Sequence, residues 1–302
     1  MTASMDLRAW VQNASGAEFA RRIATEPGLL GSSDSGGDGF GVLHHAAALG
    51  RVDLIQMILE RGVTVDTTSG TPEEYCDAEA ERPKFEPGYT PLMCAAAHGQ
   101  LATVRHLMSI GADPFKTDYH GGTALHSAAA SGLAPIVNVL LAAGCDPDAE
   151  CGYKANCEEL GFYWVGTPLH IAAEADHDAA ARALIGHGAT VDALGMLDER
   201  RPLHYAAAKG AKGAVEVLLR AGADPSRPEA FHDQTPLHYA ARGGHVDCIA
   251  LLLRYGADPR ARERETGDTA FDLAAYFYVP ERAEAMRRLL RDAVGPLETS
   301  SS

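Results

Sequence analysis

The sequence lacks the features that direct proteins to membranes, to secretion or to nucleic acid. No apolar run approaches the roughly 20 residues that span a bilayer. The start, MTASMDLRAWVQNASGAEFA, has no basic segment followed by an apolar stretch, so we do not expect a secretory signal. Lys and Arg number 26 against 41 Asp and Glu, a net charge of −15, whereas nucleic acid and anionic membranes require basic surfaces. We therefore expect an intracellular protein, cytoplasmic or nuclear, that binds neither nucleic acid nor a membrane.

Motifs for metal binding and catalysis are also missing. Structural zinc sites favour Cys pairs separated by two to four residues, and the sequence has none. It contains no G-x-S-x-G, H-E-x-x-H, P-loop or G-x-G-x-x-G pattern in a suitable context. The 6 cysteines are too few for a disulfide framework in 302 residues, so we expect reduced thiols. The sequence thus predicts no metal, no cofactor and no enzymatic activity.

One phrase recurs along the chain, in forms such as TPLHIAAEAD from Thr167 and TPLHYAARGG from Thr235. Its Leu or Phe stands at positions 43, 92, 125, 169, 203, 237 and 271, at intervals of 49, 33, 44, 34, 34 and 34. A repeat of about 33 residues accounts for four intervals, and insertions of about 16 and 11 residues account for the others. The chain is therefore expected to be an array of similar segments.

Each segment has the same internal pattern. An Ala-rich helix leads through a Gly turn to a second helix with Leu pairs, which a Gly closes. Asp-Pro often follows, as at Asp224-Pro225, and proline prevents the helix from continuing. An extended hairpin then connects to the next segment.

This phrase, with its T-P-L-H-x-A-A core and 33-residue period, resembles the ankyrin repeat over about residues 36–291. The resemblance implies an all-α fold, an ankyrin-repeat α-solenoid of helix–turn–helix units with β-hairpin-like loops. About seven repeats and an N-terminal helical cap are expected. The resemblance also implies that the phrase histidines join adjacent loops by hydrogen bonds. These are His44, His126, His170, His204 and His238.

The expected domains are a helical cap and flexible loop (1–35), the repeat array (36–293) and a disordered tail (294–302). The insertions fall at about 67–87 and 150–164. The fourth repeat is irregular, because Asp176 replaces the inter-helix Gly and Ala180-Ala181 replace larger residues. Less apolar burial there predicts the least stable part of the array.

The hairpin tips carry the candidate binding residues. Four residues before each phrase begins, an apolar or aromatic side chain recurs in four consecutive repeats, although such tips are usually exposed to solvent. Aromatic residues are enriched at binding hot spots, but the tips could instead pack on each other or under the second insertion. The candidates at this aligned position are Tyr119, Tyr163, Leu197 and Phe231. The residue that follows each of them is also a candidate, which adds His120, Trp164, Asp198 and His232.

Variable positions on the inner helices, including His98, Lys209 and Arg242, form a second candidate surface along a concave groove. We expect a monomeric, non-enzymatic protein–protein interaction module: an adaptor, scaffold or inhibitor. The alternative is small-molecule binding or catalysis in a pocket roofed by residues 150–164. Residues 1–200 carry a charge of 12 − 27 = −15 and residues 201–302 carry 14 − 14 = 0, so the protein partner is expected to have a basic region.

Overall fold

The structure, a computed structural model, describes residues 6–31, 40–70, 88–152, 166–195, 199–274 and 280–294. Every regular element in these residues is a helix, which confirms the all-α class. The chain divides into two compact units, Met1–Asp146 with Cys151–Tyr163 and Pro147–Glu150 with Trp164–Ser302. We call them the first and the second unit.

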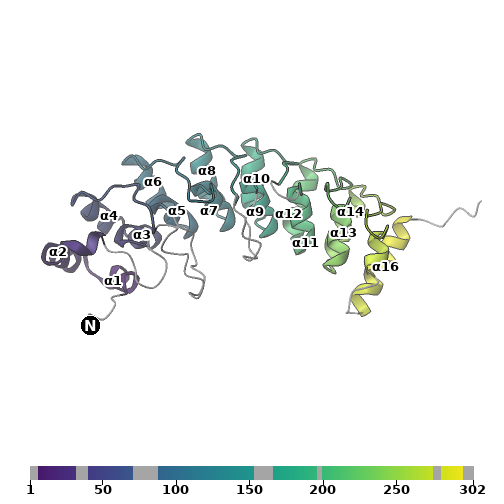
Figure 1. Ribbon diagram of the computed structural model, residues 1–302, viewed down its shortest axis with the longest axis horizontal. Coiled ribbons are helices and arrows are strands. Elements are labelled where there is room, and N and C mark those ends of the chain that lie inside the picture. Colours follow the sequence, from purple (N-terminus) through teal and green to yellow (C-terminus); the bar gives the residue numbers. More distant parts are fainter. Residues whose placement is uncertain are drawn as a thin grey trace, which may run out of the picture. The chain divides into compact units, whose positions relative to one another are not determined.

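The first unit consists of short paired helices. They are α1 (Leu7–Asn13), α2 (Gly16–Thr25), the 3₁₀ helix η1 (Pro27–Gly31), α3 (Val42–Ala48), α4 (Val52–Leu59), α5 (Pro91–Ala97), α6 (Leu101–Ser109), α7 (Ala124–Ala130) and α8 (Ala134–Ala142). The inner helices α3, α5 and α7 lie side by side, and an outer helix follows each of them (Figure 1). The two N-terminal helices extend the same order, since α1 packs on α3 and α2 on α4.

The second unit repeats the arrangement. Its helices are α9 (Pro168–Glu174), α10 (Asp178–Gly186), α11 (Pro202–Lys209), α12 (Lys212–Arg220), α13 (Pro236–Arg242), α14 (Val246–Arg254), α15 (Ala270–Leu273) and α16 (Pro280–Val294). The inner row is α9, α11, α13 and α15, and the outer row is α10, α12, α14 and α16. The last helix buries Ala283, Met286 and Leu290 and covers this end of the stack.

The alanines of the repeated phrase set the spacing of the inner helices. From α3 to α13, both phrase alanines of every inner helix are fully buried, for example Ala206 and Ala207 on α11. A methyl side chain lets two helix backbones approach closely, and the phrase leucines fill the space beside them. Leu203 is 1% exposed, and removing such a side chain costs about 2–5 kcal/mol.

In three repeats, the phrase histidine joins the inner helix to the next hairpin. Nδ1 of His170 accepts a hydrogen bond from the Thr167 N–H (3.1 Å), and Nε2 donates to the Arg200 carbonyl (3.1 Å). His238 and His44 make the same pair of bonds. These three histidines therefore have the structural role that the resemblance implied, and the bond accepted by Nδ1 requires the neutral ring.

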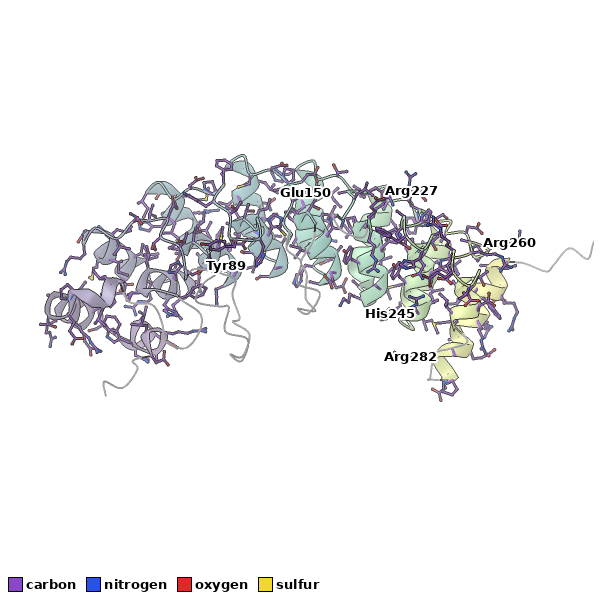
Figure 2. All side chains as sticks on the ribbon, viewed as in Figure 1. Tyr89, Glu150, Arg227, His245, Arg260 and Arg282 are labelled. Carbon is purple, nitrogen blue, oxygen red and sulfur yellow. The ribbon has the colours of Figure 1, made fainter. Side chains whose placement is uncertain are left out.

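Side chains in the turn after an inner helix also bind the preceding repeat. Gln100 Nε2 donates to the Ala48 carbonyl (3.1 Å). His245, labelled in Figure 2, donates through Nε2 to the Ala208 carbonyl (3.0 Å). Carbonyls in the last turn of a helix have no partner within it, so each repeat completes the hydrogen bonding of the helix before it.

Asp176 provides a different connection in the fourth repeat. It takes φ +58°, where the next repeat has Gly210 at φ +70°, and left-handed backbone costs a non-glycine residue roughly 1–2 kcal/mol. Its Oδ1 accepts a hydrogen bond from the Ala214 N–H in the first turn of α12 (2.8 Å). Gly213 leaves room for this carboxylate, because a Cβ there would lie 3.1 Å from Oδ1. Asp176 thus caps the outer helix of the next repeat, a stabilising contact that the repeat pattern does not reveal.

Candidate functional site

The structure describes seven of the eleven residues that the sequence marked as binding candidates. Tyr119, His120 and His98 belong to the first unit. The second unit contains Phe231 and His232, with Lys209 and Arg242 on its inner helices. Tyr163, Trp164, Leu197 and Asp198 lie outside the described residues.

Tyr119 lies at a hairpin tip of the first unit and is 56% exposed. The Asp118 carboxylate holds this tip, because its Oδ1 accepts from the N–H groups of His120 (2.8 Å) and Gly122 (2.7 Å). The His120 carbonyl accepts from the Gly152 N–H of the next hairpin (2.8 Å). Tyr119 is therefore exposed on a loop whose backbone is fixed on both sides.

Phe231 occupies the matching position in the second unit and is 54% exposed. Beneath it lies Glu229, which is only 2% exposed and accepts from the N–H groups of Phe231 (2.8 Å), His232 (2.8 Å) and Gln234 (3.2 Å). Burial raises the pKa of Glu229, but these backbone bonds together lower it by more, so the net pKa lies below its ordinary value. The ionised carboxylate organises the loop that presents Phe231.

Arg264, from the following hairpin, braces the same tip. Its Nε and Nη2 donate to the two oxygens of Asp233 (2.9 and 3.0 Å), and its Nη1 donates to the Phe231 carbonyl (3.0 Å). The Arg264 N–H donates to the His232 carbonyl (2.8 Å). His232 itself lies between Glu229 (Nδ1–Oε1, 3.5 Å) and Glu265 (Nε2–Oε1, 3.4 Å). A tip whose backbone is held this firmly loses little further backbone entropy when it binds a partner.

A second buried glutamate orders the last hairpin of the array. Glu263 is 5% exposed and accepts from Thr266 and from Gln234 Nε2 (2.7 Å). These side-chain hydrogen bonds lower the pKa of Glu263 to about 2. Gln234 belongs to the Phe231 hairpin, so the two hairpins are connected through their carboxylates.

Of the candidates on the inner helices, Lys209 and Arg242 are exposed, whereas His98 is half-buried. His98 ends α5, is half-buried and donates through Nδ1 to the Cys94 carbonyl (2.9 Å). Lys209 lies 3.1 Å from Glu174 with its side chain 58% exposed, and an ion pair of this kind contributes at most about 1 kcal/mol. Arg242 ends α13 and is exposed. Lys209 can therefore exchange this ion pair for contacts with a partner at small cost.

Tyr205 and Tyr239 are spacers between repeats. Tyr239 is 8% exposed and makes an edge contact with His204 (ring centroids 5.8 Å apart), and Tyr205 does the same with His170 (5.6 Å). The guanidinium of Arg200 lies over the Tyr239 ring, 4.8 Å from its centroid. Each tyrosine thus packs on the phrase histidine of the preceding repeat.

In the described part of the chain, no three His, Cys, Asp or Glu side chains gather in a way that could hold a metal ion. Burial raises the pKa of the Cys145 thiol to about 11 and that of Cys248 to about 12, so both are poor nucleophiles. The sequence predicted residues 150–164 as a pocket roof, and residues 153–164 of this segment lie outside the described residues.

Sequence reasoning missed several exposed apolar side chains. Phe115 is 57% exposed in the same hairpin as Tyr119, and Leu194 is 47% exposed in the second unit. Ile110 (41%) and Tyr255 (37%) end the outer helices α6 and α14. Alignment to the phrase could have revealed only recurring positions, and Phe115 has no aromatic counterpart in the other hairpins.

Comparison with known families matches most of the chain. A family model described as ankyrin repeats (3 copies) matches residues 43–151 and 149–229, and one for a single ankyrin repeat matches residues 232–264. Among solved structures, the human ASB11 ankyrin repeat domain has a TM-score of 0.65 and 28% identity, over 85% of this chain and 99% of that chain. No helix in the described ranges is long and apolar enough to cross a membrane.

Two curated relatives match shorter stretches. The chain is 37% identical over 124 residues to ankyrin repeat and SOCS box protein 18 of Homo sapiens, covering 33% of this chain and 26% of the relative. It is 39% identical over 88 residues to NF-kappa-B inhibitor delta of Mus musculus, covering 29% of this chain and 24% of the relative. The match thus spans about a quarter of each of these two relatives. It spans about a third of three further curated relatives, one from Arabidopsis thaliana and two from Oryza sativa, which are named as putative or probable E3 ubiquitin-protein ligases.

Proposed function

This chain belongs to the ankyrin repeat family, and from that premise we propose that it is a non-enzymatic module that binds another protein through its hairpin tips and inner helices. One observation carries the proposal: each unit presents an aromatic side chain that is more than half exposed on a tip held by a carboxylate. Tyr119 and Phe231 are these side chains.

Exposure and rigidity together favour a binding role. An aromatic ring left in water forgoes the burial that would stabilise the fold, and a tip loop is usually polar. Here the tip backbones are fixed by Asp118 and Glu229, and Arg264 adds a bidentate brace to Asp233. Rings that are presented in this way can bury area against a partner without first ordering a loop.

The relatives suggest how such binding could be used. NF-kappa-B inhibitor delta carries the name of an inhibitor of another protein, and ankyrin repeat and SOCS box protein 18 joins repeats to a second module. We infer that this chain acts as an adaptor, scaffold or inhibitor, in which the repeats select the partner.

A matched pair of double variants tests the proposal. Tyr119→Ala with Phe231→Ala removes one tip aromatic from each unit, and Ile110→Ala with Tyr255→Ala removes one exposed side chain from the end of an outer helix in each unit. Each version is used to capture proteins from a lysate of its own cells, with quantification by mass spectrometry. Circular dichroism and thermal unfolding establish that both variants remain folded.

We expect proteins captured by the wild type to be retained by the control and lost by the tip variant. A hot-spot aromatic contributes about 1–2 kcal/mol, so each substitution should weaken binding roughly five- to thirtyfold. Equal capture by all three versions would show that the tip aromatics are structural and would overturn the proposal.

A further inference from the structure

The outer helix α6 of the first unit carries two buried polar groups that have no hydrogen-bond partner. Thr103 is 1% exposed, and its Oγ1 neither donates nor accepts a hydrogen bond within the described residues. Nε2 of His106, one helical turn further on, is likewise buried and without a partner in the described part of the chain. Burying a polar group without a partner shifts an equilibrium toward an open state by roughly five- to a hundredfold.

Both positions are apolar in the other outer helices from α4 to α14. The position of Thr103 is occupied there by Leu54, Ile136, Ala180, Ala214 and Cys248. The position of His106 is occupied by Met57, Val139, Ala183, Val217 and Leu251. Natural proteins break such local rules chiefly where function gains from the exception. The second repeat breaks the rule twice on one helix face.

The packing around α6 is also looser than in the second unit. In the outer row, α6 lies between α4 and α8 (Figure 1). The helix α12 packs closely on both α10 and α14, whereas α6 packs on α8 and approaches α4 less closely. The inner helix α5, by contrast, packs closely on α3 and α7, and its Ala95 and Ala96 are fully buried. The second repeat is thus held firmly along the inner row and more weakly along the outer row.

We propose that α6 opens locally from its neighbours while α5 stays in the inner row, so that the second repeat flexes within the first unit. Opening brings Thr103 and His106 into contact with water, which supplies the missing hydrogen bonds. It also exposes Val104 and Leu107, both 0% exposed in the closed position, and this cost keeps the open state a minority.

The opening belongs to the free chain and so goes beyond the proposed function. It gives the first unit two positions of α6 from which a partner can select. It also places the least protected outer helix in the second repeat, whereas the sequence alone predicted the weakest point in the fourth.

Hydrogen–deuterium exchange of the full chain, expressed as protection factors, compares α6 with α8. Thr103→Val removes the unpartnered hydroxyl and keeps the shape of the side chain. His106→Leu introduces the residue type that α14 has at this position. The matched control Thr117→Val makes the first change at an exposed position in the hairpin. Thermal unfolding establishes that each variant is folded.

We expect the amides of α6 to exchange at least about tenfold faster than those of α8 in the wild type. Thr103→Val and His106→Leu should each slow exchange in α6 roughly five- to a hundredfold, because each removes a polar group whose burial favours opening. Exchange in α8 should stay unchanged in both variants, and Thr117→Val should change neither helix.

A matched pair of cysteine substitutions reports the same opening by a different chemistry. Val104 on α6 and Val137 on α8 occupy the same position in their helices, and both are 0% exposed. Iodoacetamide should label Val104→Cys at least about tenfold faster than Val137→Cys, because the open α6 exposes the thiol. Mass spectrometry maps the labelled positions, and the addition of Thr103→Val should remove most of the difference.

Equal protection of α6 and α8 overturns the inference, as does faster exchange in α10 than in α6 or unchanged exchange in both variants. Faster exchange in α6 after Thr103→Val would show that an ordered water pairs with the hydroxyl in the closed position, which also overturns it. None of these results involves the tip aromatics, so the capture experiment tests the proposed function separately.

Discussion

Acidification should destabilise this protein already between about pH 6.5 and pH 5, because the phrase histidines are buried in the neutral form. Burial lowers the pKa of His44 and of His204 from 6.5 to about 4, and it lowers the pKa of His238 as well. The hydrogen bonds of these rings require an accepting Nδ1, which the protonated form cannot provide. His44 belongs to the first unit and the other two to the second, so both units should respond.

The sign and the size follow from the difference between folded and unfolded chains. An unfolded His takes up its proton near pH 6.5 and the folded one only near pH 4, so the unfolded state binds more protons within this window. Stability is therefore complete above about pH 6.5 and falls as the pH falls toward 4. A shift from 6.5 to about 4 corresponds to roughly 3 kcal/mol for each of His44 and His204, of which roughly 2 kcal/mol is lost by about pH 5.

Urea unfolding monitored by circular dichroism at a series of pH values measures this effect. The buried Glu263, with its pKa lowered to about 2, loses its contribution only below pH 4.5, so the histidine window is separate. His204→Asn should lower the stability at neutral pH and flatten the slope below pH 6.5. A free energy of unfolding that stays constant from pH 7 to pH 5 would refute the reasoning.

Three further perturbations have defined outcomes. Asp176→Ala removes the cap on α12 and keeps a Cβ in left-handed backbone, so the free energy of unfolding should fall by about 1–2 kcal/mol. Asp176→Asn should retain most of the stability. Equal losses in the two variants would argue against the cap. Arg264→Ala removes the hydrogen bonds to Asp233 and to the Phe231 carbonyl, so amide hydrogen exchange at this tip should become faster with a small change in overall stability. Unchanged exchange at the tip would show that these bonds are not needed to order it. Burial raises the thiol pKa of Cys145 to about 11 and that of Cys248 to about 12, so both should resist iodoacetamide in the folded protein at pH 8. Both should react after unfolding, and mass spectrometry maps the labelled positions. Rapid labelling of the native chain would contradict their burial.

The fold was accessible from the sequence because its determinants are local and repeated. Proline at the start of α9 or α13, a histidine two positions later and paired alanines recur at a fixed period, and the helices form where that period places them. The N-terminal cap was also predictable, since Asp6 and Ser15 each accept from a backbone N–H in the first turn of the helix that follows. Local chemistry of this kind needs no knowledge of distant residues.

The candidate site was only partly accessible, because exposure and bracing depend on contacts between hairpins. Alignment identified Tyr119 and Phe231 as equivalent, but it could not show that Arg264, 33 residues after Phe231, would hold the second tip. The repeat pattern marked Asp176 as a defect, although its carboxylate reaches a helix 38 residues away. Phe115 was missed for the opposite reason, since a residue that does not recur leaves no signal in a repeat alignment.

Hydrogen–deuterium exchange on a complex with a captured protein tests the central claim most directly, because it locates the bound surface without any substitution. Exchange is compared between the free chain and the complex, peptide by peptide. The account predicts that binding protects the hairpin tips around Tyr119 and Phe231 and the ends of the inner helices at His98, Lys209 and Arg242. Protection confined to the outer helices, with the tips exchanging as in the free chain, would contradict it.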